Sequence, residues 1–271
     1  GHLRGGDGLI AERPFRAPHH TVSAAGLIGG GSVPRPGEAS LAHKGVLFLD
    51  ELPEFRRDAL EALRQPVEEG VVTITRSMTT VAFPSEFALV VSMNPCPCGN
   101  LGHPTAACRC TPAMLRRYLS RVSGPLLDRI DVRVALGPPA FEELSGGPAD
   151  DDTESARERV ALARRAQSER AGELSRRAAD GRACGGARVV NARLEVAVLD
   201  DAVRATPEAL SVVGAAVRKL NLSARGYHKV LRVARTVADL AGEDAVGAEH
   251  VLEALQYREV PGGPGRFGGR G

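Results

Sequence analysis

The sequence contains no tryptophan, and only three tyrosines and seven phenylalanines occur among its 271 residues. Any hydrophobic core must therefore be mainly aliphatic. The 35 basic and 33 acidic residues leave a formal net charge of +2, so bulk charge does not favour a polyanion as partner. No apolar run is long enough to span a bilayer and no segment resembles a secretory leader, so we expect a cytoplasmic protein with no membrane partner.

A phosphate loop of the form Gly-x-x-x-x-Gly-Lys-Ser/Thr is also missing from the sequence. The segment 26–32 is rich in glycine but lacks the lysine, and no strand is expected to lead into it. The chain begins with glycine rather than methionine, which suggests a fragment of a longer protein. We therefore expect this chain alone to bind ATP poorly and to hydrolyse it barely, which an assay of phosphate release would check.

The composition changes along the chain in a way that predicts two domains. Residues 1–144 carry apolar runs and loops, and 145–153 have the composition of a linker. A largely helical pattern fills 154–260, and the glycine-rich residues 261–271 are expected to be a disordered tail.

Short apolar runs in the first domain predict strands that are buried on both faces of a parallel sheet. Val46–Leu49 and Phe87–Ser92 are such runs. Between them, Val71–Ile74 and Thr80–Phe83 predict a β-hairpin. The expected fold class is therefore α/β, with a parallel sheet core and an inserted hairpin.

Proline and glycine suggest further boundaries in this domain. A helix is expected to begin at Pro53, because proline suits the first turn, and to end at Pro66. The segments 14–20 and 29–31 are expected to be loops, since neither has a helical or alternating pattern.

Beyond the linker, helical periodicity predicts an all-α domain. Its apolar residues recur at helical spacing in several successive segments. The expected helices are Glu154–Arg177, Leu194–Ala205, Glu208–Leu220, Ala224–Ala241 and Ala248–Tyr257.

Two carboxylates, Asp50 and Glu51, directly follow the apolar run Val46–Leu49. The carboxyl ends of parallel strands are where α/β sheets bind ligands. Mg²⁺ takes hard oxygen ligands, so Asp50 is a candidate ligand for the magnesium of MgATP. Glu51 can orient and deprotonate an attacking water. The alternative is that both acids merely cap the helix expected at Pro53.

Asn94 follows the next predicted strand of the sheet. An amide at this place can hold the attacking water opposite the γ-phosphate. The alternative is a simple turn residue, because Asn-Pro sequences favour turns. Two neighbouring strands that each end in a suitable polar group are a more specific signal than either one.

Four cysteines form two closely spaced pairs just after Asn94. They are Cys96, Cys98, Cys108 and Cys110. In an intracellular protein such thiols suggest a metal rather than disulfides, and four thiolates suit Zn²⁺. The single residue between the members of each pair is shorter than usual, His103 can replace one thiol, and four unliganded thiols remain the alternative. Cys184 stands alone and is expected to have no role.

The expected hairpin carries Arg76 at its turn. With the threonines near it, Arg76 can grip a DNA backbone. The alternative is a solvated tip on an edge hairpin. His19 and His20 can contact nucleic acid or a metal, and the alternative for them is an ordinary surface loop.

Six segments together closely resemble the ComM/YifB branch of the magnesium-chelatase-like AAA+ ATPases. They are Arg13–Thr21, Pro34–Glu38, Gly45–Phe55, Met93–Gly99, Ser123–Asp131 and Ser223–Arg235. The likeness runs from about Leu9 to Val260. It implies a P-loop-type AAA+ core followed by a helical lid domain, with the phosphate loop (Walker A) lying upstream of Arg13–Thr21. The core in this chain would then be truncated at its N-terminus.

The resemblance also implies roles for individual residues. Val46–Glu51 would be the Walker B strand and Asn94 would be sensor 1. Arg129 would be the arginine finger that reaches the nucleotide of a neighbouring subunit, and Arg225 would be sensor 2 on the lid. A guanidinium there stabilises charge on the transferred phosphoryl group. From the residues alone, Arg129 would instead pair with a neighbouring aspartate, and Arg225 would lie on a helix surface.

At the level of the whole protein, the resemblance implies a homo-oligomeric ring, typically a hexamer, that binds ATP with Mg²⁺. Its expected activity is that of a DNA branch-migration helicase in recombination and natural transformation. A chelatase-type motor that remodels a protein partner is the alternative, and an inactive fragment is a third possibility. The four-cysteine insert after Asn94 favours the DNA-directed branch.

Overall fold

The structure is a computed structural model that divides the chain into two compact units, Gly1–Ile130 and Asp131–Gly271, each with its own hydrophobic core. It describes residues 12–31, 33–76, 79–137, 153–177 and 190–258. The predicted linker lies outside these residues except for Thr153, and the predicted tail and Cys184 lie outside them entirely.

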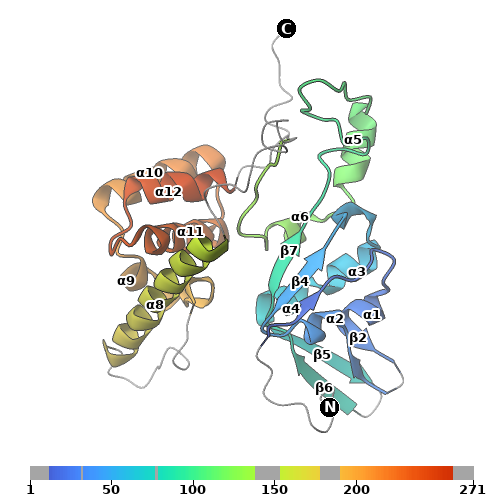
Figure 1. The fold of residues 1–271 in the computed structure, drawn as a ribbon, viewed down its shortest axis with the longest axis horizontal. Helices are drawn as coiled ribbons and strands as arrows, with labels where there is room; N and C mark the ends of the chain where they lie inside the picture. Colours follow the sequence, from blue (N-terminus) through green and yellow to red (C-terminus); the bar gives the residue numbers. More distant parts are fainter. Residues whose placement is uncertain (1–11, 32, 77–78, 138–152, 178–189, 259–271) are drawn as a thin grey trace. The chain divides into compact units, whose positions relative to one another are not determined.

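A three-stranded parallel sheet forms the centre of the first unit (Figure 1). Its order is β1 (Phe15–Arg16), β4 (Val46–Leu49), β7 (Ala88–Val91). In the central strand Leu47 and Leu49 are fully buried, but Val46 and Phe48 are only partly buried and no residue of β7 is fully buried. The prediction of strands buried on both faces of the sheet was therefore wrong. The mixed α/β class with a parallel sheet is confirmed. The prediction of a loop over 14–20 was wrong at β1, because a two-residue strand is too short to leave a periodic pattern.

Gly45 allows β1 to lie close to β4. A Cβ atom at Gly45 would be 1.9 Å from the carbonyl oxygen of Pro14, far inside the closest approach of real side chains. That same oxygen accepts a hydrogen bond of 2.8 Å from the backbone N–H of Val46. Any larger residue at position 45 would push the first strand away from the sheet.

Short elements connect the first two strands of the sheet. They are α1 (Ala24–Ile28), β2 (Gly29–Gly30), β3 (Arg35–Pro36) and α2 (Glu38–Leu41). Gly29 and Gly30 pair antiparallel with β3, so the prediction of a loop there was wrong for these two residues. Arg16 donates two hydrogen bonds, of 2.6 and 2.8 Å, to the carboxylate of Glu38 and so ties β1 to α2.

The segment after β4 contains a 3₁₀ turn, η1 (Leu52–Glu54), and two short helices, α3 (Arg57–Ala62) and α4 (Arg64–Glu69). Pro66 was predicted to end the helix, and that prediction was wrong. The helix breaks at Leu63, so Pro66 falls in the first turn of α4, where a missing N–H costs nothing. Gly70 ends α4 in the left-handed conformation.

The predicted β-hairpin is present between α4 and β7. Its strands are β5 (Val71–Arg76) and β6 (Thr79–Pro84), and Arg76 lies opposite Thr79 at the end that carries the turn. The turn residues 77–78 and the side chain of Arg76 lie outside what the structure describes. After β7, a loop with the four cysteines leads into α5 (Pro112–Leu119) and α6 (Gly124–Leu127).

The second unit is helical, as predicted. Its α-helices are α8 (Thr153–Arg177), α9 (Leu199–Val203), α10 (Pro207–Leu220), α11 (Ala224–Ala241) and α12 (Ala248–Gln256). The helix expected over Leu194–Ala205 is helical only from Leu199, because 3₁₀ turns η2 (Asn191–Arg193) and η3 (Val196–Val198) precede it. α11 packs against α8, α9 and α12. No helix among the described residues has both the length and the apolarity to cross a membrane.

Candidate functional site

Hydrogen bonds connect the carboxyl ends of β4 and β7 at one edge of the sheet. Leu49 lies opposite Val91 in the register, and the N–H of Ser92 donates to the carbonyl of Leu49 at 3.0 Å. The N–H of Leu52 returns to the carbonyl of Ser92 at 2.9 Å, and the Ser92 hydroxyl donates to a carboxylate oxygen of Asp50. The first acid after the strand is therefore held by the neighbouring strand end.

Glu51 has an unusual backbone conformation at this edge. Its φ of 52° lies in the left-handed region, which costs about 1–2 kcal/mol for a residue with a side chain. Its N–H donates to Oδ1 of Asp50 at 2.9 Å. Its side chain is 55% exposed and makes no capping hydrogen bond to η1. This differs from the alternative in which Glu51 serves only to cap the helix expected at Pro53. Strain of this kind typically persists where a side chain must point in one functional direction.

His20 lies against Glu51, a contact that the sequence alone does not predict. Nδ1 of His20 is 3.3 Å from Oε2 of Glu51, and its ring lies edge-on to Phe55 at 6.3 Å between centroids. The contact arises because β1 runs parallel to β4, so the chain that leaves β1 reaches the same edge of the sheet. The His19-His20 pair is visible in the sequence as a candidate contact site. It lies about thirty residues before Asp50 and Glu51, however, so the sequence does not show that His20 contacts Glu51.

Asn94 lies two residues beyond Ser92 and is exposed. Behind it, the ring of Tyr118 in α5 is buried. Burial raises the pKa of Tyr118, and a hydrogen bond from the backbone of Asn94 to the Tyr118 oxygen opposes that shift. The turn that carries Asn94 therefore lies next to Tyr118 of α5.

Arg129 is held inside the first unit. Its guanidinium donates to the carbonyl oxygens of Pro125 at 2.7 Å and Arg64 at 3.2 Å, and it pairs with the carboxylate of Glu68 on α4. The side chain is only 13% exposed. Its acidic partner is therefore on α4 and not one of the aspartates beside it in the sequence.

Arg225 belongs to the second unit, where it lies exposed in the first turn of α11. This helix begins at a well-formed cap, in which the Ser223 hydroxyl accepts a hydrogen bond of 3.2 Å from the N–H of Gly226. The cap fixes the direction of the first turn and hence the position of Arg225 on the unit.

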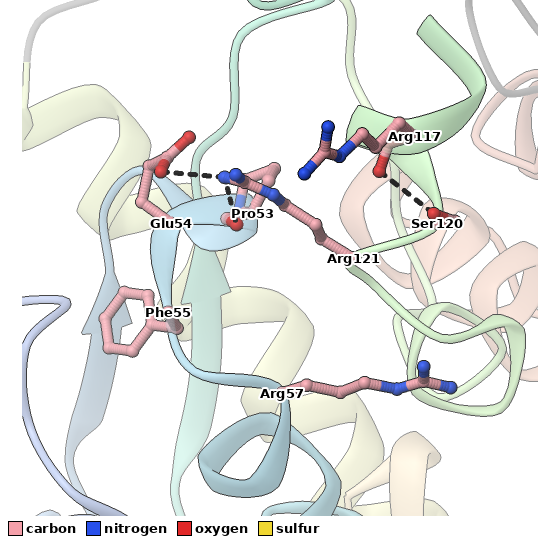
Figure 2. A pocket seen from close by; sticks show the side chains of 7 residues that line it. All are labelled: Pro53, Glu54, Phe55, Arg57, Arg117, Ser120 and Arg121. Carbon is pink, nitrogen blue, oxygen red and sulfur yellow. Dashed lines mark hydrogen bonds and ion pairs between the residues drawn. The ribbon is translucent and has the colours of Figure 1, made fainter. Parts of the chain in front are cut away.

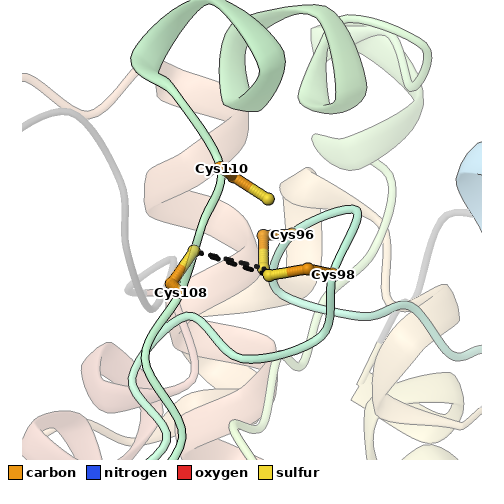
Figure 3. A group of neighbouring side chains, drawn as sticks. All are labelled: Cys96, Cys98, Cys108 and Cys110. Atoms are coloured by element: carbon orange, nitrogen blue, oxygen red, sulfur yellow. Dashed lines mark hydrogen bonds between the residues drawn. The ribbon is translucent and has the colours of Figure 1, made fainter.

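The four cysteines of the paired motif come together after Asn94 (Figure 3). Sγ of Cys96 is 3.4 Å from that of Cys98 and 3.8 Å from that of Cys108, and all four Sγ atoms lie within 4.8 Å of one another. A tetrahedral zinc ion with bonds of about 2.3 Å needs sulfur atoms about 3.8 Å apart. A disulfide would need about 2.05 Å. The donor set therefore fits zinc.

The loop around these thiols supports a metal site. Backbone N–H groups of Asn100 and Arg109 lower the pKa of Cys98 to about 6, which makes it a thiolate at neutral pH. Partial burial raises the pKa of Cys110 to about 12, a shift that a bound cation would reverse. Nδ1 of His103 accepts hydrogen bonds from the backbone within its own turn, so the clustered donor set is the four thiols without His103.

The fold and this edge of the sheet define an α/β protein in which acidic side chains follow the carboxyl end of one parallel strand and an amide side chain follows the next. Residues 2–144 match the family "Magnesium chelatase, subunit ChlI", and residues 150–258 match the C-terminal domain of the same subunit. The chain therefore belongs to the magnesium chelatase family of AAA ATPases.

Curated relatives place the chain more closely. It is 42% identical over 252 residues to the competence protein ComM of Haemophilus influenzae and 38% identical to YifB of Escherichia coli, covering 92% of this chain and 46% of each relative. An uncharacterized protein of Mycobacterium tuberculosis is 41% identical over 264 residues, covering 96% of this chain and 49% of that protein. The chain thus spans about half the length of the relatives it matches.

Proposed function

We propose that this chain supplies the magnesium-binding and hydrolytic part of a P-loop-type AAA+ motor of the ComM kind, which acts on DNA. Asp50 would hold the magnesium of MgATP, Glu51 would activate the attacking water, and Asn94 would orient that water. The observation that carries the proposal is the strained Glu51 beside Asp50 at the carboxyl edge of the sheet. The similarity to the competence protein ComM supports DNA as the substrate.

Arg129 and Arg225 are proposed to supply the positive charge that the nucleotide site needs. Arg129 would act as an arginine finger on the nucleotide of a neighbouring subunit in a ring, most simply a hexamer, and Arg225 would act as sensor 2 on a helical lid. In this structure Arg129 is neutralised by Glu68, so reaching a nucleotide would require exchange of that pair for phosphate oxygens. Arg76, at the end of the β5–β6 hairpin, would contact the DNA.

The test is ATP hydrolysis by the complete gene product that contains these residues, with and without DNA. We expect turnover that needs Mg²⁺ and that rises when single-stranded or branched DNA is added. Turnover that no DNA changes would contradict the DNA-directed function and favour a motor that remodels a protein partner. Absence of any Mg²⁺-dependent turnover would contradict the motor itself.

His20 is proposed to position Glu51 through the 3.3 Å contact. We expect His20→Ala to lower kcat of the complete gene product by about tenfold with little change in KM for ATP, because misorientation affects the reaction more than binding. His20→Gln, which keeps a polar partner, should restore part of the rate. The comparison variant is His19→Ala, because the ring of His19 bonds Thr21 and packs on the ring of His20 with 4.1 Å between centroids, so its loss should cost less than the loss of His20. Equal losses in both variants would contradict the positioning role.

We propose that zinc occupies the four-thiol site and holds the loop between Asn94 and α5 in one conformation. We expect about one zinc ion per purified chain, since four thiolates form a closed tetrahedral site. The double change Cys96→Ser and Cys108→Ser should reduce zinc to background, as measured by mass spectrometry of the metal. Cys184→Ser is the control, because Cys184 does not belong to the paired motif in the sequence, and it should leave the zinc content unchanged. Background zinc in the unmodified chain would contradict the site.

A further inference from the structure

A basic pocket of about 400 Å³ lies beside η1 in the first unit, next to the segment that carries Glu51 (Figure 2). Its charged lining comes from Glu54, Arg57, Arg117 and Arg121, with Ser120 between the last two. The proposed catalytic residues do not use this pocket.

Only one of the three arginines in the pocket is neutralised. Arg121 donates to a carboxylate oxygen of Glu54 at 2.8 Å and to the carbonyl oxygen of Pro53 at 3.2 Å. Arg57 and Arg117 are exposed, and neither guanidinium makes a hydrogen bond or close ion pair with a described residue. The charge of Arg57 acts at longer range on Glu61 and helps to lower the pKa of that carboxyl group. In Figure 2 the guanidinium of Arg117 points toward the Arg121–Glu54 pair. The pocket therefore carries a net positive charge and unused guanidinium donors, which match phosphate oxygens.

The surroundings of the pocket favour an extended anion over a single small one. No aspartate or glutamate occurs between Glu86 and Asp128, a segment that holds four arginines and no lysine. These are Arg109, Arg116, Arg117 and Arg121, of which the last three lie in α5 and the turn after it and form a basic stretch that includes the lining of the pocket. Successive phosphates of a polymer can neutralise such a stretch, whereas one free phosphate occupies only the pocket.

We propose that the pocket formed by Arg57, Arg117 and Arg121 binds the phosphodiester backbone of a nucleic acid. The proposal rests on the DNA-directed function above and names a contact surface for it. A phosphate in the pocket competes with Glu54 for Arg121. Glu54 and Pro53 belong to the turn that directly follows Glu51, so the pocket lies next to the proposed hydrolytic residue.

The test is fluorescence anisotropy of a labelled single-stranded oligonucleotide with the 271-residue chain over a range of salt concentrations. The double variant Arg57→Ala and Arg117→Ala should weaken binding about tenfold at low salt. It should also reduce the slope of log Kd against log salt by about 1.4, because each phosphate contact on a single strand contributes about 0.7. Circular dichroism of both proteins checks that the variant is folded.

A matched control is the double variant Arg164→Ala and Arg165→Ala, which removes an equally charged, exposed pair from α8. It should leave the affinity and the salt slope nearly unchanged. Equal losses in both double variants, or no binding by the unmodified chain, would overturn the proposal. Displacement of the oligonucleotide by inorganic phosphate or ATP at equal phosphate concentration would also overturn it, in favour of a small-anion site. ATP hydrolysis by the complete gene product tests the motor separately.

Discussion

Replacement of Glu51 by glutamine is expected to reduce ATP hydrolysis by the complete gene product by about 10²–10⁴-fold, the usual contribution of a general base. The amide keeps the size and the hydrogen-bonding reach of the side chain but cannot accept the proton of the attacking water. Affinity for MgATP should change little, because Asp50 still holds the proposed magnesium position through its bond from Ser92. Steady-state phosphate release measures the rate, and equilibrium binding of a labelled nucleotide measures the affinity.

Glu69→Gln is the matched control for this experiment. Glu69 is an exposed carboxylate at the end of α4 whose only described side-chain hydrogen bond comes from Gln65. Its replacement removes the same charge from the same unit and should leave the rate within twofold of the unmodified protein. If Glu51→Gln retained more than a third of the normal rate, Glu51 would not be the base. Asp50 or a residue outside this chain would then have to activate the water.

The sequence predicted the helices and strands in which apolar residues form a continuous run or recur at a regular spacing. The apolar run predicted the central strand Val46–Leu49, although only Leu47 and Leu49, on one face of the sheet, are fully buried. Helix α11 was predicted to the residue, because a serine cap and a glycine stop bound a strongly amphipathic stretch. In contrast, β1 and β2 have two residues each and depend on pairing partners, which no local pattern reveals.

The candidate site divides in the same way. Asp50 and Asn94 each follow a recognisable strand, so their presence at one sheet edge could be inferred. The contact between His20 and Glu51 could not, because it depends on β1 being parallel to β4. The left-handed backbone conformation of Glu51 also could not be predicted, because residues with a positive φ are usually glycine or asparagine and neither occurs there. For the cysteines, spacing within each pair argued against zinc, whereas the separations between pairs in space favour it.

The second unit contains a buried charge network that is centred on Asp239 of α11. Asp239 on α11 is bonded to Arg235, which is fully buried, and to Arg170 of α8. Asn191 also donates to the carboxylate at 2.8 Å. Burial lowers the pKa of Arg235, and the charge of Asp239 opposes that shift. Asp239 is therefore the carboxylate that bonds both buried guanidinium groups, while the exposed Asp244 acts on Arg235 only through its charge.

Asp239→Ala is expected to destabilise the second unit by about 3–5 kcal/mol, because it leaves two like charges buried without their counter-ion. Hydrogen exchange of α11 peptides, read by mass spectrometry, should then accelerate by about 10²-fold or more, since each 1.4 kcal/mol is a factor of ten. The exchange rate of Asp239→Asn, which keeps an acceptor oxygen, should lie between those of the unmodified protein and Asp239→Ala. The control is Asp244→Ala, whose side chain is 79% exposed and whose pair with Arg204 is worth less than about 1 kcal/mol. If both alanine variants accelerated exchange equally, the buried network would contribute no more than a surface pair. The second unit would then owe its stability to its apolar core alone.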